Sequence, residues 1–160
     1  MFQKFTTLTA ITAITVMAGL TLSASAQNLV VDPGFDSGNL DAYDVFLNSG
    51  EAEVITDPTT GSNVANLVAD TNGESPLIKA AELGGPVAPG TQFEISFDAK
   101  GTFTPGGVAF AEFFSEDVEG QGASKSEILG GGPLALTDTF QTFNFVATAG
   151  PSTARGVTLQ

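Results

Sequence analysis

The amino-acid sequence predicts an all-β fold, an antiparallel β-sandwich of jelly-roll type built as one domain. Short runs rich in Val, Ile, Phe and Thr alternate with Gly and Pro, which is typical of strands and turns. The runs recur about every ten residues, as they do in sandwiches, and no long segment has the apolar period of a helix. With 160 residues and 42% hydrophobic side chains, the chain is large enough to bury one core.

Residues 1–26 are predicted to be a secretory signal peptide, followed by one domain over residues 27–160. Lys4 is the only charged side chain of this segment, and residues 8–22 are mostly apolar. Small residues at 24–26 form the cleavage pattern. The apolar stretch is shorter than the roughly 20 residues that a membrane-spanning helix needs. We therefore expect a secreted protein, extracellular or periplasmic, with no membrane attachment after cleavage.

The composition excludes several classes of function. The chain has no Cys, His or Trp, so it has no disulfide, no thiolate nucleophile, no Ser-His-Asp triad and no His-based zinc site. Removing Lys4 from the 5 basic residues leaves 4 against 18 acidic ones, a net charge of −14. This balance disfavours nucleic acid and other polyanions as partners. Carboxylate chemistry and calcium binding through oxygen remain compatible with it.

The turns and strands follow in a regular order along the mature chain. Strands are expected at residues 28–31, 52–56, 64–69, 77–83, 91–100, 108–115, 140–147 and 156–160. The segment 91–100 alternates most clearly, with Phe93, Ile95, Phe97 and Ala99 on the buried face. Glu94, Asp98 and Lys100 lie on its polar face. They are candidates for hydrogen bonds to sugar hydroxyls if that face binds a ligand, and are otherwise ordinary solvent-facing residues.

The segment 108–115 allows two arrangements because both of its faces contain aromatic residues. Burying Glu112 without a partner is costly, so one arrangement turns Ala109, Ala111 and Phe113 inward. Phe110, Glu112 and Phe114 then lie on an accessible face that suits a ligand. In the other arrangement Phe110 belongs to the core and Glu112 lies beyond a bulge. In the later segment 140–147, Phe143, Phe145 and Ala147 are expected to point inward.

Four motifs occur in the order found in a known family. Residues 28–38 read Asn-Leu-Val-Val-Asp-Pro-Gly-Phe-Asp-Ser-Gly, and residues 61–65 read Gly-Ser-Asn-Val-Ala. Residues 89–101 contain Pro-Gly followed by Ser-Phe and Lys, and residues 137–145 read Thr-Asp-Thr-Phe-Gln-Thr-Phe-Asn-Phe. Together they resemble the CenC-type carbohydrate-binding modules of families 4, 9 and relatives, which have a galactose-binding-like jelly roll.

The resemblance implies a structural calcium held by Asp36 and by oxygens around Ser62 and Asn63. Alternatively, Asp36 only caps its own turn. Where the family usually has a Trp, this chain offers Tyr43 or Phe46. The family's closing Asp-rich strand has no counterpart here, so we expect a sandwich that lacks its last strand.

These features predict an exported, non-catalytic module that binds a polysaccharide, with a neutral glycan favoured by the negative charge. Stacking is assigned to Tyr43, Phe110 and Phe114, and polar contacts to Glu94, Asp98, Lys100 and Glu112. Two carboxylates on adjacent strands can meet the spacing that a glycosidase needs, but chance pairs are expected among so many acids. We expect a monomer. The alternatives are a structural or adhesion domain without a sugar site, and the leading module of a longer polysaccharide hydrolase or lyase.

Overall fold

The computed structural model describes residues 27–70, 75–103, 107–118 and 121–160, and the described chain is all-β with antiparallel strands. This confirms the predicted all-β, antiparallel fold class, whereas the jelly-roll type stays a prediction. The elements are β1 (Asp44–Phe46), β2 (Glu51–Thr56), β3 (Asn63–Val68), β4 (Leu77–Leu83), β5 (Gln92–Ala99), β6 (Glu112–Glu116), β7 (Ala123–Ile128), a 3-10 turn η1 (Leu129–Gly131), β8 (Gln141–Thr148) and β9 (Gly156–Leu159). The predicted signal peptide lies outside the described residues.

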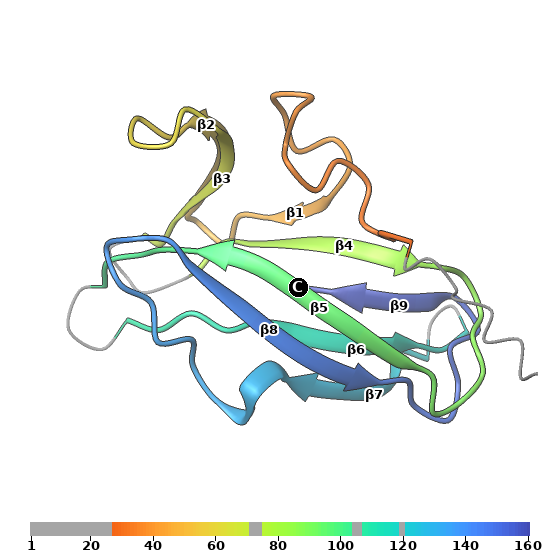
Figure 1. Ribbon diagram of the computed structural model, residues 1–160. Helices are drawn as coiled ribbons and strands as arrows, with labels where there is room; N and C mark the ends of the chain where they lie inside the picture. The colour runs from red at the N-terminus through yellow and green to blue at the C-terminus, as the bar shows by residue number, and fades with distance from the viewer. Residues whose placement is uncertain (1–26, 71–74, 104–106, 119–120) are drawn as a thin grey trace, which may run out of the picture.

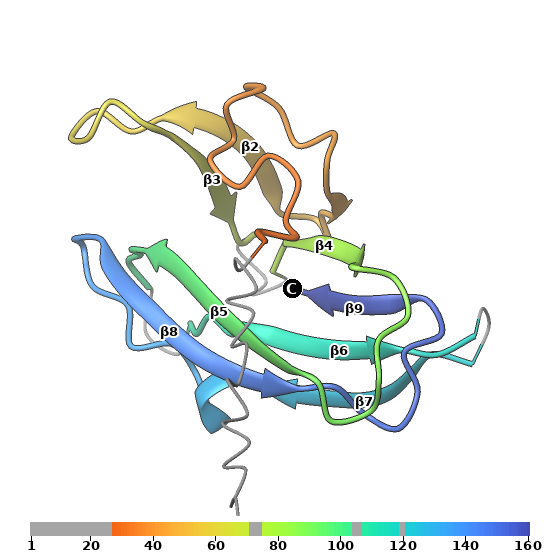
Figure 2. The same ribbon diagram turned by 45° about the vertical axis from the view of Figure 1, so that its right-hand side comes forward.

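The strands form two layers and a separate hairpin. A five-stranded sheet has the order β1-β4-β9-β6-β7, and β5 pairs with β8 in a two-stranded ribbon. The β5–β8 ribbon covers one face of the five-stranded sheet (Figures 1 and 2). The β2–β3 hairpin and the preceding loop lie beyond the β1–β4 edge of that sheet. The other face of the five-stranded sheet, called the outer face below, is therefore left uncovered by the ribbon.

The core lies between the five-stranded sheet and the ribbon. Its buried members are Ile95, Ala111, Phe113, Leu129, Ala147 and Val157. The Phe93 and Phe113 rings meet across the layers with centroids 5.5 Å apart. Fully burying a phenylalanine contributes about 1.5–3 kcal/mol, so Phe113 is a strong anchor between the layers. The alternation predicted for β5 and β8 is confirmed by these inward side chains.

The last described strand lies at the centre of the sheet. β9 pairs antiparallel with β4 on one side and with β6 on the other. Residues more than 70 positions apart in the sequence are thereby joined, so the five-stranded sheet depends on the final residues of the chain. The expectation of a missing closing strand stays a prediction.

Two expected strand segments differ from the observed structure. The segment 28–31 is not a strand: Val31 is 67% exposed, and Val30 N–H donates to the Asn28 side chain rather than to a ladder. Residues 108–111 are also not a strand, although Ala109 and Ala111 carbonyls accept backbone hydrogen bonds from Leu134 and Leu129. Within the described residues, neither apolar segment pairs with a neighbouring strand. A strand requires such a partner for its backbone hydrogen bonds.

Two observed strands were not predicted. β1 has only three residues, which is too short for an alternating pattern. β7 places Lys125 and Glu127 on the same side as buried Ser115 and Phe113, so its inward positions are polar. Lys125 pairs with Glu127 at 2.5 Å and donates to the Thr148 carbonyl at 2.7 Å. Because the inward side chains of the edge strand β7 are polar and are paired with polar groups, the sequence shows no alternation of apolar residues there.

Over the described residues, we find no helix with the length and apolarity needed to cross a lipid bilayer.

Candidate functional site

The exposure of residues 110–114 decides which of the two predicted arrangements forms. Ala111 and Phe113 are buried at 5% and 2% exposure, whereas Phe110 is 44% exposed. Glu112 and Phe114 are partly exposed on the outer face. The arrangement with Phe110, Glu112 and Phe114 outward is confirmed, and the interpretation of Phe110 as a core residue is wrong. The physical reason is the one expected: a carboxylate at Glu112 stays in contact with water.

Strand register brings residues of four strands onto the same face as Phe114. Phe114 lies directly opposite Thr158 of β9. On the other side of β9, Lys79 of β4 lies opposite Asp44 of β1. Residues opposite one another in antiparallel strands share a face. The outer face therefore gathers side chains from the two ends and the middle of the sequence.

Lys79 lies between two aromatic rings on this face. Its Nζ is 5.3 Å from the centre of the Phe46 ring and 5.4 Å from that of Phe114. Such a contact between a cation and an aromatic ring contributes about 0.5–1 kcal/mol at an exposed site. Phe46 is 47% exposed, so much of its surface remains open. We call Phe46, Lys79 and Phe114 the Lys79 face.

A hollow of about 200 Å³ adjoins these residues. It is lined by Asp44, Phe46, Lys79, Ala81, Glu82, Glu116, Arg155 and Thr158. The β4–β9 register shifts between Ala80 and Leu83, and Glu82 at this bulge has a φ of 54°. A Cβ on Gly156 would lie 2.7 Å from the Leu83 carbonyl oxygen, so only glycine fits opposite the bulge. The bulge turns Glu82 toward Arg155, with which it forms an ion pair.

The chemistry of the face is mixed. Lys79 and Arg155 supply hydrogen-bond donors, while Asp44 and Glu116 supply acceptors around the same hollow. Two phenylalanine rings supply apolar surface beside them. Such a combination suits a ligand that has both apolar surface and several hydroxyl groups.

Glu94 and Asp98 lie on the opposite side of the molecule. Phe93, Ile95 and Phe97 of β5 face the core, so Glu94 and Asp98 point outward from the ribbon. The Thr142 hydroxyl donates to Asp98 Oδ1 at 2.6 Å across the strands. The structure therefore does not bring these two acids together with Phe110, Glu112 and Phe114, because the whole core separates them.

Lys100 is part of a clasp between β5 and the β2–β3 turn. It forms an ion pair with Asp57, which is only 2% exposed, and its Nζ lies 4.5 Å from the centre of the Phe140 ring. Asp57 Oδ1 also accepts the Thr59 and Thr60 backbone N–H groups at 2.9 Å. The Lys100 hydrogen bond is the main reason that the pKa of Asp57 falls to about 2, with these N–H groups adding to it. Lys100 thus stabilises the hairpin and does not belong to the outer face.

Tyr43 packs in the loop that precedes β1. Its ring stacks on Phe35 with centroids 5.3 Å apart, and its hydroxyl donates to the Asp32 carbonyl at 3.0 Å. Burial raises the pKa of the Tyr43 phenol, and the nearby Asp32 carboxylate adds to this. The ring of Tyr43 is therefore used to hold this loop together.

The residues expected to hold calcium come together only in part. Asn63 Nδ2 donates to the Phe35 carbonyl at 3.0 Å, which joins the loop around Asp36 to the start of β3. Asp32 is the residue that caps the turn: its carboxylate accepts the Asp36 and Ser37 N–H groups, and hydrogen bonding from Ser37 lowers its pKa. Across the described ranges, no group of three or more His, Cys, Asp and Glu side chains converges as a metal site. Asp36 is the one carboxylate of the expected set, with Ser62 and Asn63 able to add only neutral oxygens.

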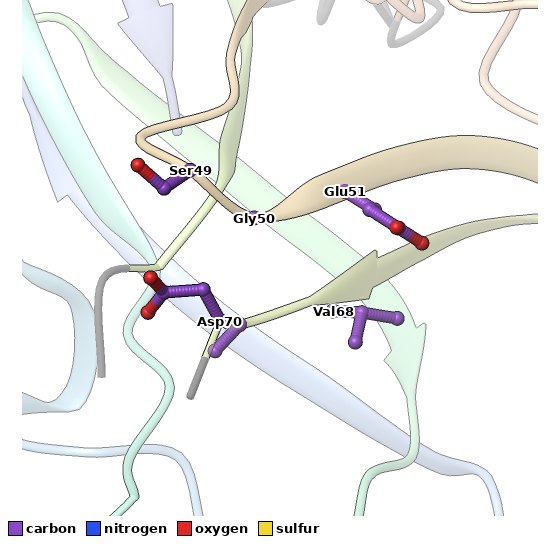
Figure 3. A pocket seen from close by; sticks show the side chains of 6 residues that line it. Ser49, Gly50, Glu51, Val68 and Asp70 are labelled. Atoms are coloured by element: carbon purple, nitrogen blue, oxygen red, sulfur yellow. The ribbon is translucent and has the colours of Figure 1, made fainter. Parts of the chain in front are cut away.

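A second, larger hollow of about 310 Å³ lies between the start of β2 and the end of β3 (Figure 3). It is lined by Ser49, Gly50, Glu51, Val68, Ala69 and Asp70. The Glu51 and Asp70 side chains point in different directions in Figure 3. Its lining contains no aromatic ring and no basic side chain, so it offers less to a hydroxyl-rich ligand than the outer face does.

No family model, no curated protein and no solved structure matches this chain. The resemblance to CenC-type modules therefore stays a prediction that rests on the four sequence motifs.

Phe46, Lys79 and Arg155 are residues of the site that sequence reasoning missed, although Phe46 was considered as the counterpart of the family's Trp. A signal for Lys79 was available, because it is one of few basic residues and interrupts the apolar strand Leu77–Leu83. No comparable signal existed for Arg155, which reaches the hollow only through the bulge at Glu82.

Proposed function

We propose that this chain is an exported, non-catalytic domain that binds a neutral polysaccharide on the Lys79 face. The observation that carries the proposal is the Lys79 ammonium held between two partly exposed phenylalanine rings beside a hollow. A sugar ring has apolar C–H surfaces that pack on aromatic rings and hydroxyls that donate and accept hydrogen bonds. The face offers both kinds of contact at one place.

A neutral ligand fits the charge of the face better than an anionic one. Arg155 is already paired with Glu82, while Asp44 and Glu116 also line the hollow. An anionic chain would approach these carboxylates and a mature protein with a net charge of −14, derived from 18 acidic and 4 remaining basic side chains. Binding alone accounts for this arrangement, so the proposal includes no reaction within the chain.

The proposal retains a structural calcium near Asp36, with Ser62 and Asn63 as further oxygen ligands. Its support is the contact that joins the Asp36 loop to the start of β3 through Asn63 and Phe35. Bound calcium would stabilise this junction.

The test is a pull-down of the mature chain, residues 27–160, on insoluble xylan, β-glucan, galactan and alginate, with calcium and with a chelator. We expect retention on at least one neutral polysaccharide. Retention on alginate alone would contradict the choice of a neutral ligand. No retention of a folded chain would contradict the proposal and favour a structural or adhesion domain. A lower melting temperature with the chelator would support the calcium, and an unchanged one would contradict it.

A further inference from the structure

Lys79 differs from every other basic residue in the described chain by its lack of an acidic partner. Lys100 pairs with Asp57, Lys125 with Glu127 and Arg155 with Glu82. Lys79 contacts aromatic rings instead, although Asp44 lies opposite it in the strand register. In a chain with 18 acidic residues, an ammonium without a carboxylate partner is a group available to a ligand.

We propose that Lys79 determines which glycans this face accepts, by donating hydrogen bonds to two neighbouring free hydroxyls of one sugar unit. The inference rests on the proposed function and adds the residue and the ligand groups that set specificity. An ammonium carries three N–H donors and no acceptor. The Phe46 and Phe114 rings interact with its charge but are weak acceptors, so its N–H groups keep their capacity for oxygen acceptors.

The rings also fix where the ammonium lies. Lysine has a flexible stem with four carbons, and ordering it costs conformational entropy. Here Nζ lies 5.3 and 5.4 Å from two ring centres on strands β1 and β6, and Lys79 itself is half-buried. The donor is therefore positioned before a ligand arrives, and less of this cost falls on binding.

The surrounding acids favour hydroxyls over a carboxylate or sulfate as the group bound by Lys79. A hydroxyl can accept from the ammonium and donate its own proton to Asp44 or Glu116, which line the same hollow. An anionic group can only accept, and it would lie close to these two carboxylates. Replacing the free hydroxyls by methyl ethers would remove the donors and crowd the hollow.

The experiment measures affinity electrophoresis of wild type, Lys79→Met and Lys79→Arg in soluble xylan, β-glucan and galactan, and in O-methylated preparations of each. Methionine keeps the apolar stem without the charge, and arginine restores a cation over the rings. Lys125→Met removes the same charge from the edge strand β7 and serves as the control for net charge. A thermal melt verifies that each variant is folded.

We expect Lys79→Met to weaken binding about 10-fold or more, as is typical for a lost hydrogen bond from a charged group. Lys79→Arg should recover part of this loss, and Lys125→Met should bind like wild type. O-methylation should weaken wild type and Lys79→Met alike, because it removes the hydroxyl protons donated to Asp44 and Glu116 and crowds the hollow, whereas an ether oxygen can still accept from an ammonium. If wild type binds and Lys79→Met binds equally well, or if O-methylation leaves wild-type binding unchanged, the inference is overturned while the proposed function stands. If folded wild type binds no polysaccharide, the proposed function fails and the inference fails with it.

Discussion

Lys79 and Lys100 make the same kind of contact at two regions of the molecule, with different consequences. Each ammonium lies near phenylalanine, Lys79 near two rings and Lys100 near the Phe140 ring. Lys100 also pairs with the buried Asp57 carboxylate, whereas Lys79 has no ion pair in the described chain. The partner of the cation, rather than its aromatic contact, therefore decides what each lysine does. Lys100 is committed to the hairpin clasp, and Lys79 remains open to a ligand.

The largest expected effect comes from removing the rings of the Lys79 face. The double substitution Phe46→Ala and Phe114→Ala should weaken polysaccharide binding about 100-fold, because it removes both the stacking surface and the support of the ammonium. Both rings are partly exposed, so folding should persist. Affinity electrophoresis gives the binding change, and a thermal melt verifies the fold.

The matched control is Phe103→Ala, which removes a phenylalanine of similar exposure, 43%, that does not line the hollow. This variant should bind like wild type. Equal losses in the control and in the double variant would show that the Lys79 face is not the binding surface.

The clasp at Lys100 should govern acid stability instead of binding. The pKa of Asp57 is about 2 in the folded chain against an ordinary value of 3.8. A carboxyl whose pKa is lowered by folding stabilises the native state above its ordinary pKa, and this contribution is lost as pH falls through the folded value. Wild type should therefore lose stability between about pH 4 and pH 2 in part through Asp57.

Asp57→Asn tests this, because asparagine keeps an oxygen for the two turn N–H groups but loses the charge. We expect a melting temperature several degrees lower at neutral pH and a smaller further fall between pH 4 and pH 2. Scanning fluorimetry across this range measures both. Parallel pH profiles for the two proteins would contradict the assignment, and reduced sugar binding by the folded variant at neutral pH would remove the contrast between the two lysines.

The smallest expected effect is at the outer side of the ribbon. Glu94→Gln together with Asp98→Asn should leave binding within about twofold of wild type, since these residues lie across the core from the Lys79 face. Asparagine keeps an acceptor for the Thr142 hydroxyl, so the fold should not change. A clear loss of affinity in the same electrophoresis assay would extend the binding surface to the ribbon.

The alternation of apolar and polar residues predicted much of the fold, because a strand that is buried on one face has an apolar residue at every second position. The strand Leu77–Leu83 was placed with the observed bounds, and β5 and β8 were placed within one residue. β7 was missed, because its inward positions carry the ion pair of Lys125 and Glu127 instead of apolar residues. The candidate site was predicted only through Phe114, since an acid flanked by aromatic residues points to an accessible face. Phe110 and Glu112 are accessible as expected, but they do not line the hollow.

By itself the sequence determined the all-β class, the acidic character and the inward or outward direction of most strand residues, since these follow from composition and alternation. Only the tertiary structure decided which outward faces belong together. It placed β9 between β4 and β6, set Lys79 between Phe46 and Phe114, and directed Glu94 and Asp98 to the far side. Strand order and register arise from contacts between residues far apart in the chain, and alternation within one strand carries no information about its neighbours.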